Sequence, residues 1–381
     1  MRHLTLAPAG KTRHGPSWPH APERHALTTE SAVSWSDPER QLAFMRWLSS
    51  LPPQLGIEAE SLRPASADAS FRRYFRLDTA QGPRIVMDAP PEREDCAPFV
   101  QVAATLRGGG LRVPEVLEGD RGLGFLMLTD LGSTTYLAAL RGPPRLDAAQ
   151  ANRLYLGALD SLVRLQGLPV QAQVPAYDRA LMRRELDLFP DWYVARHCGA
   201  TLTDRERDVL ERSFALILDA CLAQPAVLVH RDYHSRNLMR PDPADRDQRP
   251  GVLDFQDAVW GPVSYDLASL LRDAYVEWDE EVQLDWAVRY WEKARSGGLP
   301  VDDDFGVFWR GFEWMGLQRH LKVLGIFARL SQRDGKDGYL EDLPLVWRYA
   351  HRVAMRYSGL KGLALLLERM AGTSRESGYT F

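Results

Sequence analysis

Cysteine is scarce in this sequence, and its scarcity excludes two kinds of small scaffold. The three cysteines, Cys96, Cys198 and Cys221, are widely spaced and include no Cys-x-x-Cys pair. Such a set supports neither a disulfide framework nor a structural zinc site. We therefore expect buried thiols in a protein of a reducing compartment.

Long apolar runs are also missing. No stretch approaches the roughly 18 apolar residues that mark a membrane-spanning helix, and the amino-terminal region has no apolar segment of the signal-peptide kind. The net charge of -4 gives no electrostatic reason to expect nucleic acid or an anionic membrane as a partner. These absences predict a cytoplasmic protein that binds neither.

Lysine is the scarcest charged residue. Only five of the 47 lysine and arginine residues are lysines, and none lies between Lys11 and Lys293. The planar fork of arginine suits phosphate and carboxylate oxygens, but it cannot replace a lysine in the same geometry. A cationic site within that long range would therefore have to be built around arginine.

What the sequence does contain is a set of polar residues directly after two short apolar runs. Asp232 follows residues 226–229, Asn237 stands five positions later, and Asp254 follows residues 251–253. Such runs predict buried strands, whose ends carry functional loops. Phosphoryl transfer needs a carboxylate near the acceptor hydroxyl, plus a carboxamide and a second carboxylate for magnesium. We predict these roles for Asp232, Asn237 and Asp254; the plainer alternative is turn residues and a strand-end cap.

Length and pattern predict two lobes. At 381 residues the chain is long for a single hydrophobic core. Residues 1–36 contain several prolines and no periodicity, which predicts a disordered extension. We expect a small, mostly β lobe over residues 37–131, a mainly helical lobe over residues 132–372 and a tail over residues 373–381. The fold class is α+β, with a hinge near Gly132.

Local patterns predict the elements inside these lobes. A periodic apolar pattern with Leu42, Met45 and Leu48 predicts a helix near the start of the first lobe. Other patterns predict strands over 71–77, 85–87, 113–117 and 125–128, and helices over 99–106, after Asp147 and after Thr203.

The pattern over residues 61–360 resembles the aminoglycoside phosphotransferase and choline kinase superfamily. Residues 254–258, Asp-Phe-Gln-Asp-Ala, and residues 265–268, Tyr-Asp-Leu-Ala, are similar to that family's metal loop and the helix after it. Three further segments are similar to the cell-wall amino-sugar kinases: 69–76, 86–91 and 318–325. Those enzymes phosphorylate the anomeric hydroxyl of N-acetylmuramate and N-acetylglucosamine in peptidoglycan recycling.

The resemblance implies a protein-kinase-like two-lobed fold, with ATP as co-substrate and Mg2+ as cofactor. It implies that Asp232 orients or deprotonates the acceptor hydroxyl, while Asn237 and Asp254 hold magnesium at the ATP phosphates. Asp266 would brace the catalytic loop. Two other functions stay open: phosphorylation of an aminoglycoside or another small-molecule hydroxyl, and a pseudokinase that binds nucleotide without turnover.

The chain departs from the family in the small lobe. Family members carry a lysine on the third strand and a glutamate on the next helix, but Met87 stands at the strand position and the helix has no glutamate. Four arginines could contact the phosphates instead, or could point to solvent: Arg72, Arg73, Arg76 and Arg84. The residues that we expect to bind nucleotide are Ser70, Arg73, Arg84 and Asp130.

Substrate residues are expected in the helical lobe, because a sugar stacks its apolar face on rings and pairs its hydroxyls with polar groups. The apolar stripe Trp314, Leu317, Leu321 and Leu324 predicts one buried helix face. Gln318, Lys322 and Arg329 lie on another face, where a basic group could bind the lactyl carboxylate of muramate or simply face solvent. The expected substrate-binding residues are Tyr177, Glu185, Trp192, His234, Gln318 and Lys322.

Overall fold

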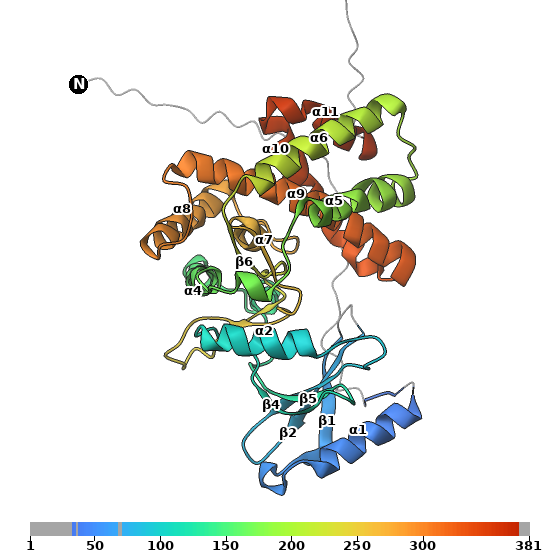
Figure 1. Ribbon diagram of the computed structural model, residues 1–381, viewed down its shortest axis with the longest axis vertical. Coiled ribbons are helices and arrows are strands. Elements are labelled where there is room, and N and C mark those ends of the chain that lie inside the picture. The colour runs from blue at the N-terminus through green and yellow to red at the C-terminus, as the bar shows by residue number, and fades with distance from the viewer. Residues whose placement is uncertain (1–32, 36, 68–70, 373–381) are drawn as a thin grey trace, which may run out of the picture.

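The first lobe is built on a five-stranded antiparallel sheet (Figure 1). The structure, a computed structural model, describes residues 33–35, 37–67 and 71–372. The spatial strand order is β1-β2-β3-β5-β4. The strands are β1 (Glu58–Ala67), β2 (Arg73–Asp78), β3 (Arg84–Asp88), β4 (Val116–Asp120) and β5 (Phe125–Thr129). Four of these strands were expected from the sequence, and β1 was not.

Strand β1 escaped prediction because it has no alternating apolar pattern. Its sequence contains Glu58, Glu60, Arg63 and Pro64, and its pairing with β2 is irregular at two places. Proline and charged residues are tolerated on an edge strand, which needs hydrogen-bond partners on one side only. The sheet therefore gains a polar edge.

The two faces of the sheet are covered by different helices, α1 (Pro38–Ser50) and α2 (Ala97–Gly108), as Figure 1 shows. On the outer face, Phe75 and Val86 belong to one core cluster with Phe44 of α1. On the inner face, Met87 belongs to a second cluster with Phe99 of α2. Alternation along β2 and β3 thus decides which residues face the second lobe.

The helix that the sequence predicts near the start of the lobe is present as α1, but with a different buried face. Phe44, Trp47 and Leu48 are buried, whereas Leu42 and Met45 are exposed. The aromatic side chains occupy the buried face because their burial removes more apolar area from water.

The first lobe begins earlier than the predicted boundary at Asp37. The ring centroid of Trp35 lies 5.1 Å from that of Phe44 and 5.4 Å from that of Phe75. Residues 33–35 therefore belong with the lobe rather than with an extension. The predictions for residues 1–32 and 373–381 lie outside the described residues.

The second lobe is mainly helical. Its helices are α3 (Tyr136–Arg141), α4 (Ala148–Gln166), α5 (Arg179–Leu188), α6 (Asp204–Leu222), α7 (Tyr265–Leu271), α8 (Glu280–Ser296), α9 (Phe305–Asp334), α10 (Leu343–Arg356) and α11 (Lys361–Met370). Asp147 and Thr203 form the predicted helix starts, each with a complete capping box. In the described part of the chain, no helix has the length and apolar character needed to cross a membrane.

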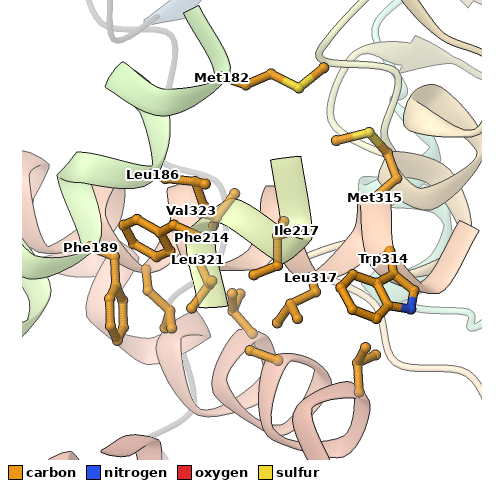
Figure 2. Close-up of a cluster of buried hydrophobic side chains, with 14 of the residues drawn as sticks. Met182, Leu186, Phe189, Phe214, Ile217, Trp314, Met315, Leu317, Leu321 and Val323 are labelled. Atoms are coloured by element: carbon orange, nitrogen blue, oxygen red, sulfur yellow. The ribbon is translucent and has the colours of Figure 1, made fainter. Parts of the chain in front are cut away.

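Helix α9 is the central element of this lobe. The predicted stripe is confirmed, since Trp314, Leu317, Leu321 and Leu324 are buried. Figure 2 shows part of this packing, with Leu317 and Leu321 of α9 near Phe214 and Ile217 of α6. Because α9 is covered on several sides, several of its polar residues are buried as well, among them Gln318, Arg319 and Lys322.

Two short antiparallel strand pairs lie beside the polar residues that follow the apolar runs. Strand β6 (Ala226–Val229) pairs with β9 (Val259–Pro262), and β7 (Leu238–Met239) pairs with β8 (Gly251–Val252). The loop after β6 and the loop after β8 are thereby brought side by side. This pairing positions the site described next.

Candidate active site

The loop after β6 is held in shape by buried carboxylates from α7 and its C-terminal end. Oδ2 of Asp266 accepts a hydrogen bond from His230 N at 2.7 Å, and Oδ1 accepts one from Arg231 N at 3.0 Å. Further on, Oδ2 of Asp273 accepts one from Ser235 N at 3.0 Å. The bracing role expected of Asp266 agrees with this geometry. Burial raises the pKa of Asp266 to about 7, whereas the two backbone hydrogen bonds favour its ionised form.

Two residues in these loops have left-handed backbone conformations. The φ angle is 78° at Arg231 and 64° at Asp254. A non-glycine residue in this region stores strain, which persists only where the surroundings over-determine the backbone. The strain flanks Asp232 and includes Asp254, so it falls on the residues predicted to do the chemistry.

Asp232, Asn237 and Asp254 converge. Nδ2 of Asn237 donates to the backbone oxygen of Asp232 at 3.0 Å and to Oδ2 of Asp254 at 3.3 Å. Oδ1 of Asp254 accepts a second bond, from Nε2 of Gln256 at 2.7 Å. The tertiary structure therefore brings the three predicted residues together from two separate loops.

The oxygen atoms of this group fit a magnesium ion. Mg2+ prefers hard oxygen ligands and is usually held by one or two carboxylates together with substrate phosphates. Asp254 provides a carboxylate, and Asn237 has a carboxamide oxygen whose nitrogen is already engaged. Oε1 of Gln256, next to Asp254, is buried with no hydrogen-bond partner. An orphaned oxygen of this kind is a candidate ligand for water or metal.

The carboxylate of Asp232 is accessible and lies among positive charges. Its side chain is 43% exposed, and Oδ1 is 4.0 Å from Nε2 of His234. Burial raises the pKa of Asp232, but Lys322, His234 and Arg319 outweigh it and hold that pKa below its usual value. Asp232 is therefore ionised at neutral pH and can accept a hydrogen bond from a hydroxyl.

Three of the predicted substrate residues meet on the buried carboxylate of a fourth, Glu185. Nζ of Lys322 lies 2.8 Å from Oε1 of Glu185 and donates to the Tyr265 hydroxyl at 3.1 Å. Nε2 of Gln318 donates to Oε2 of Glu185 at 3.3 Å, and the Tyr177 hydroxyl and Arg231 guanidinium also donate to Glu185. We call Tyr177, Glu185, Arg231, Gln318 and Lys322 the Glu185 cluster. The alternative of a solvated helix face is wrong for Gln318 and Lys322, since both are buried.

The Glu185 cluster places two cations on one carboxylate. Burial opposes ionisation of Glu185, but Lys322 and Arg231 outweigh it and lower the pKa of the carboxyl group. Two cations therefore share one anion beside Asp232. Removal of the anion would leave both cations in a poorly solvated place.

We expect the Glu185→Gln variant to lose about 3 kcal/mol of unfolding free energy, because breaking a buried ion pair from one side leaves an uncompensated charge. Urea denaturation of the purified protein measures this loss. Glu211→Gln is the matched control, since Glu211 pairs with Arg183 at the surface. That control should change stability by about 1 kcal/mol or less. Equal stability of the two variants would show that the Glu185 cluster is not a buried ion-pair network.

The remaining predicted substrate residues are placed differently. His234 lies beside Asp232, within the same loop. Trp192 lies in the π-helical segment Phe189–His197, packs against the hydrophobic core and has the Arg196 guanidinium carbon 5.0 Å from its ring centroid. Arg329 is later on α9 and only partly buried. The structure thus groups His234, but neither Trp192 nor Arg329, with the Glu185 cluster and Asp232.

Arg319 is a residue that the sequence reasoning missed. It lies on α9 between Gln318 and His320 and is 3% exposed, and its Nε and Nη1 atoms are buried without hydrogen-bond partners. The signal was its place in the segment 318–325, three residues before Lys322. A buried guanidinium with open donors beside Asp232 can receive an anion.

The structure corrects the preference for Arg73 and Arg84 as phosphate ligands. Nε and Nη2 of Arg73 both donate to Oδ2 of Asp88 on the outer face, and its guanidinium carbon lies 4.1 Å from the centroid of Trp35. Arg84 also leaves β3 on the outer face and donates to the backbone oxygen of Pro83 at 3.0 Å. Alternation turns both side chains away from Asp254.

Asp130 lies at the connection between the lobes. Its carboxylate accepts from Nε of Arg76 at 2.6 Å and from Gly132 N at 2.9 Å. Nη2 of Arg76 also donates to the Gly132 backbone oxygen at 2.9 Å. Asp130 therefore ties the hinge to β2. Ser70, the fourth predicted nucleotide residue, lies outside the described residues.

Known proteins are similar to this chain in sequence, in fold or in both. The model of the phosphotransferase enzyme family matches residues 61–300. A protein of Neisseria meningitidis serogroup B named N-acetylmuramate/N-acetylglucosamine kinase is 47% identical over 345 residues, which cover 90% of this chain and 100% of that protein. A Pseudomonas aeruginosa protein of the same name is 46% identical over 87% of this chain and 97% of its own length. The GDP complex of wild-type aminoglycoside 2'-phosphotransferase-IIIa aligns with a TM-score of 0.57 and 16% identity, over 85% of this chain and all of that one. At that identity, the structural likeness shows the fold alone: the two-lobed, kinase-like α+β architecture.

Proposed function

The chain belongs to the phosphotransferase enzyme family, and from this premise we propose that it transfers the terminal phosphoryl group of ATP to the anomeric hydroxyl of N-acetylmuramate, N-acetylglucosamine or both. The observation that carries the proposal is the convergence of Asp232, Asn237 and Asp254, in a chain 47% identical to a kinase named for those two sugars. The enzyme would serve peptidoglycan recycling in the cytoplasm. Residues 37–131 would bind nucleotide and residues 132–372 would bind the sugar.

Asp232 is the group that meets the acceptor. Its ionised, accessible carboxylate can accept the hydrogen of the anomeric hydroxyl, orient the oxygen and take the proton as the new bond forms. An anomeric hydroxyl is more acidic than an ordinary alcohol, so a carboxylate with a lowered pKa suffices as base. Positioning by the braced loop supplies much of the remaining rate.

Asn237 and Asp254 would hold Mg2+ through their side-chain oxygens. When bound, the ion neutralises charge on the ATP phosphates. The hydrogen bonds from Gln256 and Asn237 fix the orientation of the Asp254 carboxylate before nucleotide arrives. Pre-orientation of this kind reduces the reorganisation required during the reaction.

The Glu185 cluster and Arg319 would form the wall of the sugar site. Buried donors and acceptors suit sugar hydroxyls, and the cationic groups beside Asp232 suit the lactyl carboxylate of muramate. The same positive charges, Lys322, Arg231 and Arg319, disfavour a polycation such as an aminoglycoside. This charge distribution supports an amino-sugar substrate over an antibiotic.

Turnover of a small substrate panel tests the proposal. Purified protein with ATP and Mg2+ is assayed by coupled ADP release with N-acetylmuramate, N-acetylglucosamine, choline and kanamycin. We expect both amino sugars to be phosphorylated, with kcat/KM at least 100-fold above that for choline or kanamycin. Phosphorylation of kanamycin but of neither sugar would establish the aminoglycoside alternative. Binding of ATP without turnover of any acceptor would instead support a pseudokinase.

A further inference from the structure

The small lobe has a buried methionine where related kinases use a lysine. Met87 lies on the inner face of β3 and is 0% exposed, so it cannot contact the nucleotide phosphates as a cation. Phosphoryl transfer needs positive charge near those phosphates. A cation of the first lobe on the inner face of the sheet can supply it.

The register of β2 and β3 identifies which arginine lies near Met87. Tyr74 is directly opposite Met87, and Arg73 is opposite Asp88. Tyr74 packs against the inner cluster, whereas Arg73 pairs with Asp88 on the outer face. Arg72, immediately before β2, has the same parity as Tyr74 and is therefore a diagonal neighbour of Met87.

An ion pair confirms that Arg72 points inward. Its Nη2 lies 2.9 Å from Oε2 of Glu94, a residue just before α2, and the side chains are only 10% and 17% exposed. Helix α2 covers the inner face of the sheet. The pair thus couples the start of β2 to the segment before α2. In the resembled family, a lysine and a glutamate couple the third strand to that helix.

The same end of α2 lies against the loop that carries Asp254. The ring centroid of Phe99, in the first turn of α2, is 5.0 Å from that of Phe255, the residue after Asp254. Burial lowers the pKa of Arg72, but Tyr74, Glu94, Asp257 and Asp254, in decreasing order of effect, outweigh it and raise the pKa. Arg72 therefore lies within electrostatic reach of the loop predicted to hold the metal.

The other arginines of the first strands have different partners. Arg73 is bound to Asp88, and Arg76 is bound to Asp130 at the hinge. Arg84 leaves the sheet on the outer face. A guanidinium has five donors in a planar fork, so Arg72 can bind Glu94 and phosphate oxygens at the same time.

We propose that Arg72, positioned by Glu94, binds the phosphates of the nucleotide and takes the place of the missing lysine. This inference rests on the proposed kinase function, since it names the nucleotide-binding residue of that same site. Arg72 contacts the phosphates directly. Glu94 acts through Arg72, by holding the guanidinium on the inner face.

Direct nucleotide binding and steady-state kinetics of three variants test the proposal. Arg72→Met removes the cation, and Glu94→Gln removes the negative charge that pairs with Arg72. Arg72→Lys keeps a cation but changes its geometry. The matched control is Arg107→Met, because Arg107 forms an exposed ion pair with Glu115 in the same lobe. Isothermal titration with ADP and Mg2+ measures affinity without any turnover.

For Arg72→Met, we expect the Kd for ADP and the KM for ATP to rise at least 10-fold and kcat to fall at least 100-fold, while the KM for the sugar stays within about 2-fold. Glu94→Gln should raise the KM for ATP by about 5-fold to 10-fold with a smaller loss of kcat. Arg72→Lys should recover part of the affinity, and Arg107→Met should behave like the wild type.

The proposal is overturned if Arg72→Met binds ADP within 2-fold of the wild type, or if Arg107→Met loses as much affinity. Unaltered urea midpoints show that the variants are folded. If Arg72→Met does not fold, Glu94→Gln carries the test, and wild-type affinity of that variant for ADP would equally overturn the proposal. A wild-type protein that binds ADP but phosphorylates no acceptor would refute the proposed function alone. In that case, the effect of Arg72 on ADP binding still decides this proposal.

Discussion

The Asp232→Asn variant should lose about 10³-fold in kcat with either amino sugar, within the range that a general base contributes. Asparagine keeps the size of the side chain and removes the negative charge that accepts the hydroxyl hydrogen. The affinity for ADP should stay within about 2-fold, because the proposed mechanism places Asp232 at the acceptor and not at the nucleotide. Coupled-assay kinetics and titration with ADP measure the two quantities on the same preparation.

A surface variant controls for the loss of one carboxylate. Asp219 lies on α6 and pairs with Arg179 at the protein surface, and Asp219→Asn should leave kcat unchanged. Far-ultraviolet circular dichroism of both variants should match that of the wild type. If Asp232→Asn kept more than about one tenth of the wild-type kcat, Asp232 would not be the general base.

The Asp254→Asn variant should lose about 10³-fold in kcat/KM and should need a higher Mg2+ concentration for half-maximal rate. Asparagine is the informative substitution because it tolerates the left-handed backbone that Asp254 adopts, with φ at 64°. The loss would then report the missing charge and not a strained loop. Mg2+ titrations at saturating ATP and sugar, for the variant and the wild type, measure the shift.

Asp285→Asn serves as the control for this second experiment, since Asp285 is an exposed partner of Arg289 on α8. It should leave both the rate and the Mg2+ requirement unchanged. An Asp254→Asn enzyme with a reduced rate but an unaltered Mg2+ requirement would contradict the role of Asp254 as a metal ligand. Its carboxylate would then act only in organising the loop with Asn237 and Gln256.

The first lobe illustrates how an arginine-rich chain assigns its cations. Asp88, which is fully buried, receives Arg40 from α1 and Arg73 from β2 on the outer face. Asp130 receives Arg76 at the hinge, and Glu94 receives Arg72 on the inner face. Each carboxylate specifies a different place for its arginine. Composition alone cannot reveal these pairings, because all the arginines are chemically alike.

The sequence predicted the family, the two-lobed α+β fold and the convergence of Asp232, Asn237 and Asp254. These predictions were possible because their signals are local. An apolar run of four residues predicts a buried strand, and the polar residue after it predicts a loop at that strand's end. The helix starts at Asp147 and Thr203 were predicted for the same reason, since an N-cap and a capping box are signals within about four consecutive residues.

The Glu185 cluster was only half visible in the sequence. Four of its members were predicted individually as sugar contacts and Arg231 was not. The carboxylate that they share depends on α5, α9 and the loop after β6 meeting in space. Lys322 is separated from Glu185 by well over one hundred residues, so no local pattern connects them. Long-range ion pairs of this kind depend on packing, which brings the charges together and removes their water.

By itself, the sequence determined which residues are equipped for phosphoryl transfer, because the chemistry depends on residue type and short spacing. Only the tertiary structure decided which arginine can replace the absent lysine. A one-residue step along β2 moves a side chain to the opposite face of the sheet. Arg72 and Arg73 are therefore the same residue type but lie on opposite faces. Which face becomes the inner one depends on where α1 and α2 pack, and that is settled by the burial of Phe44 and Phe99 in separate clusters.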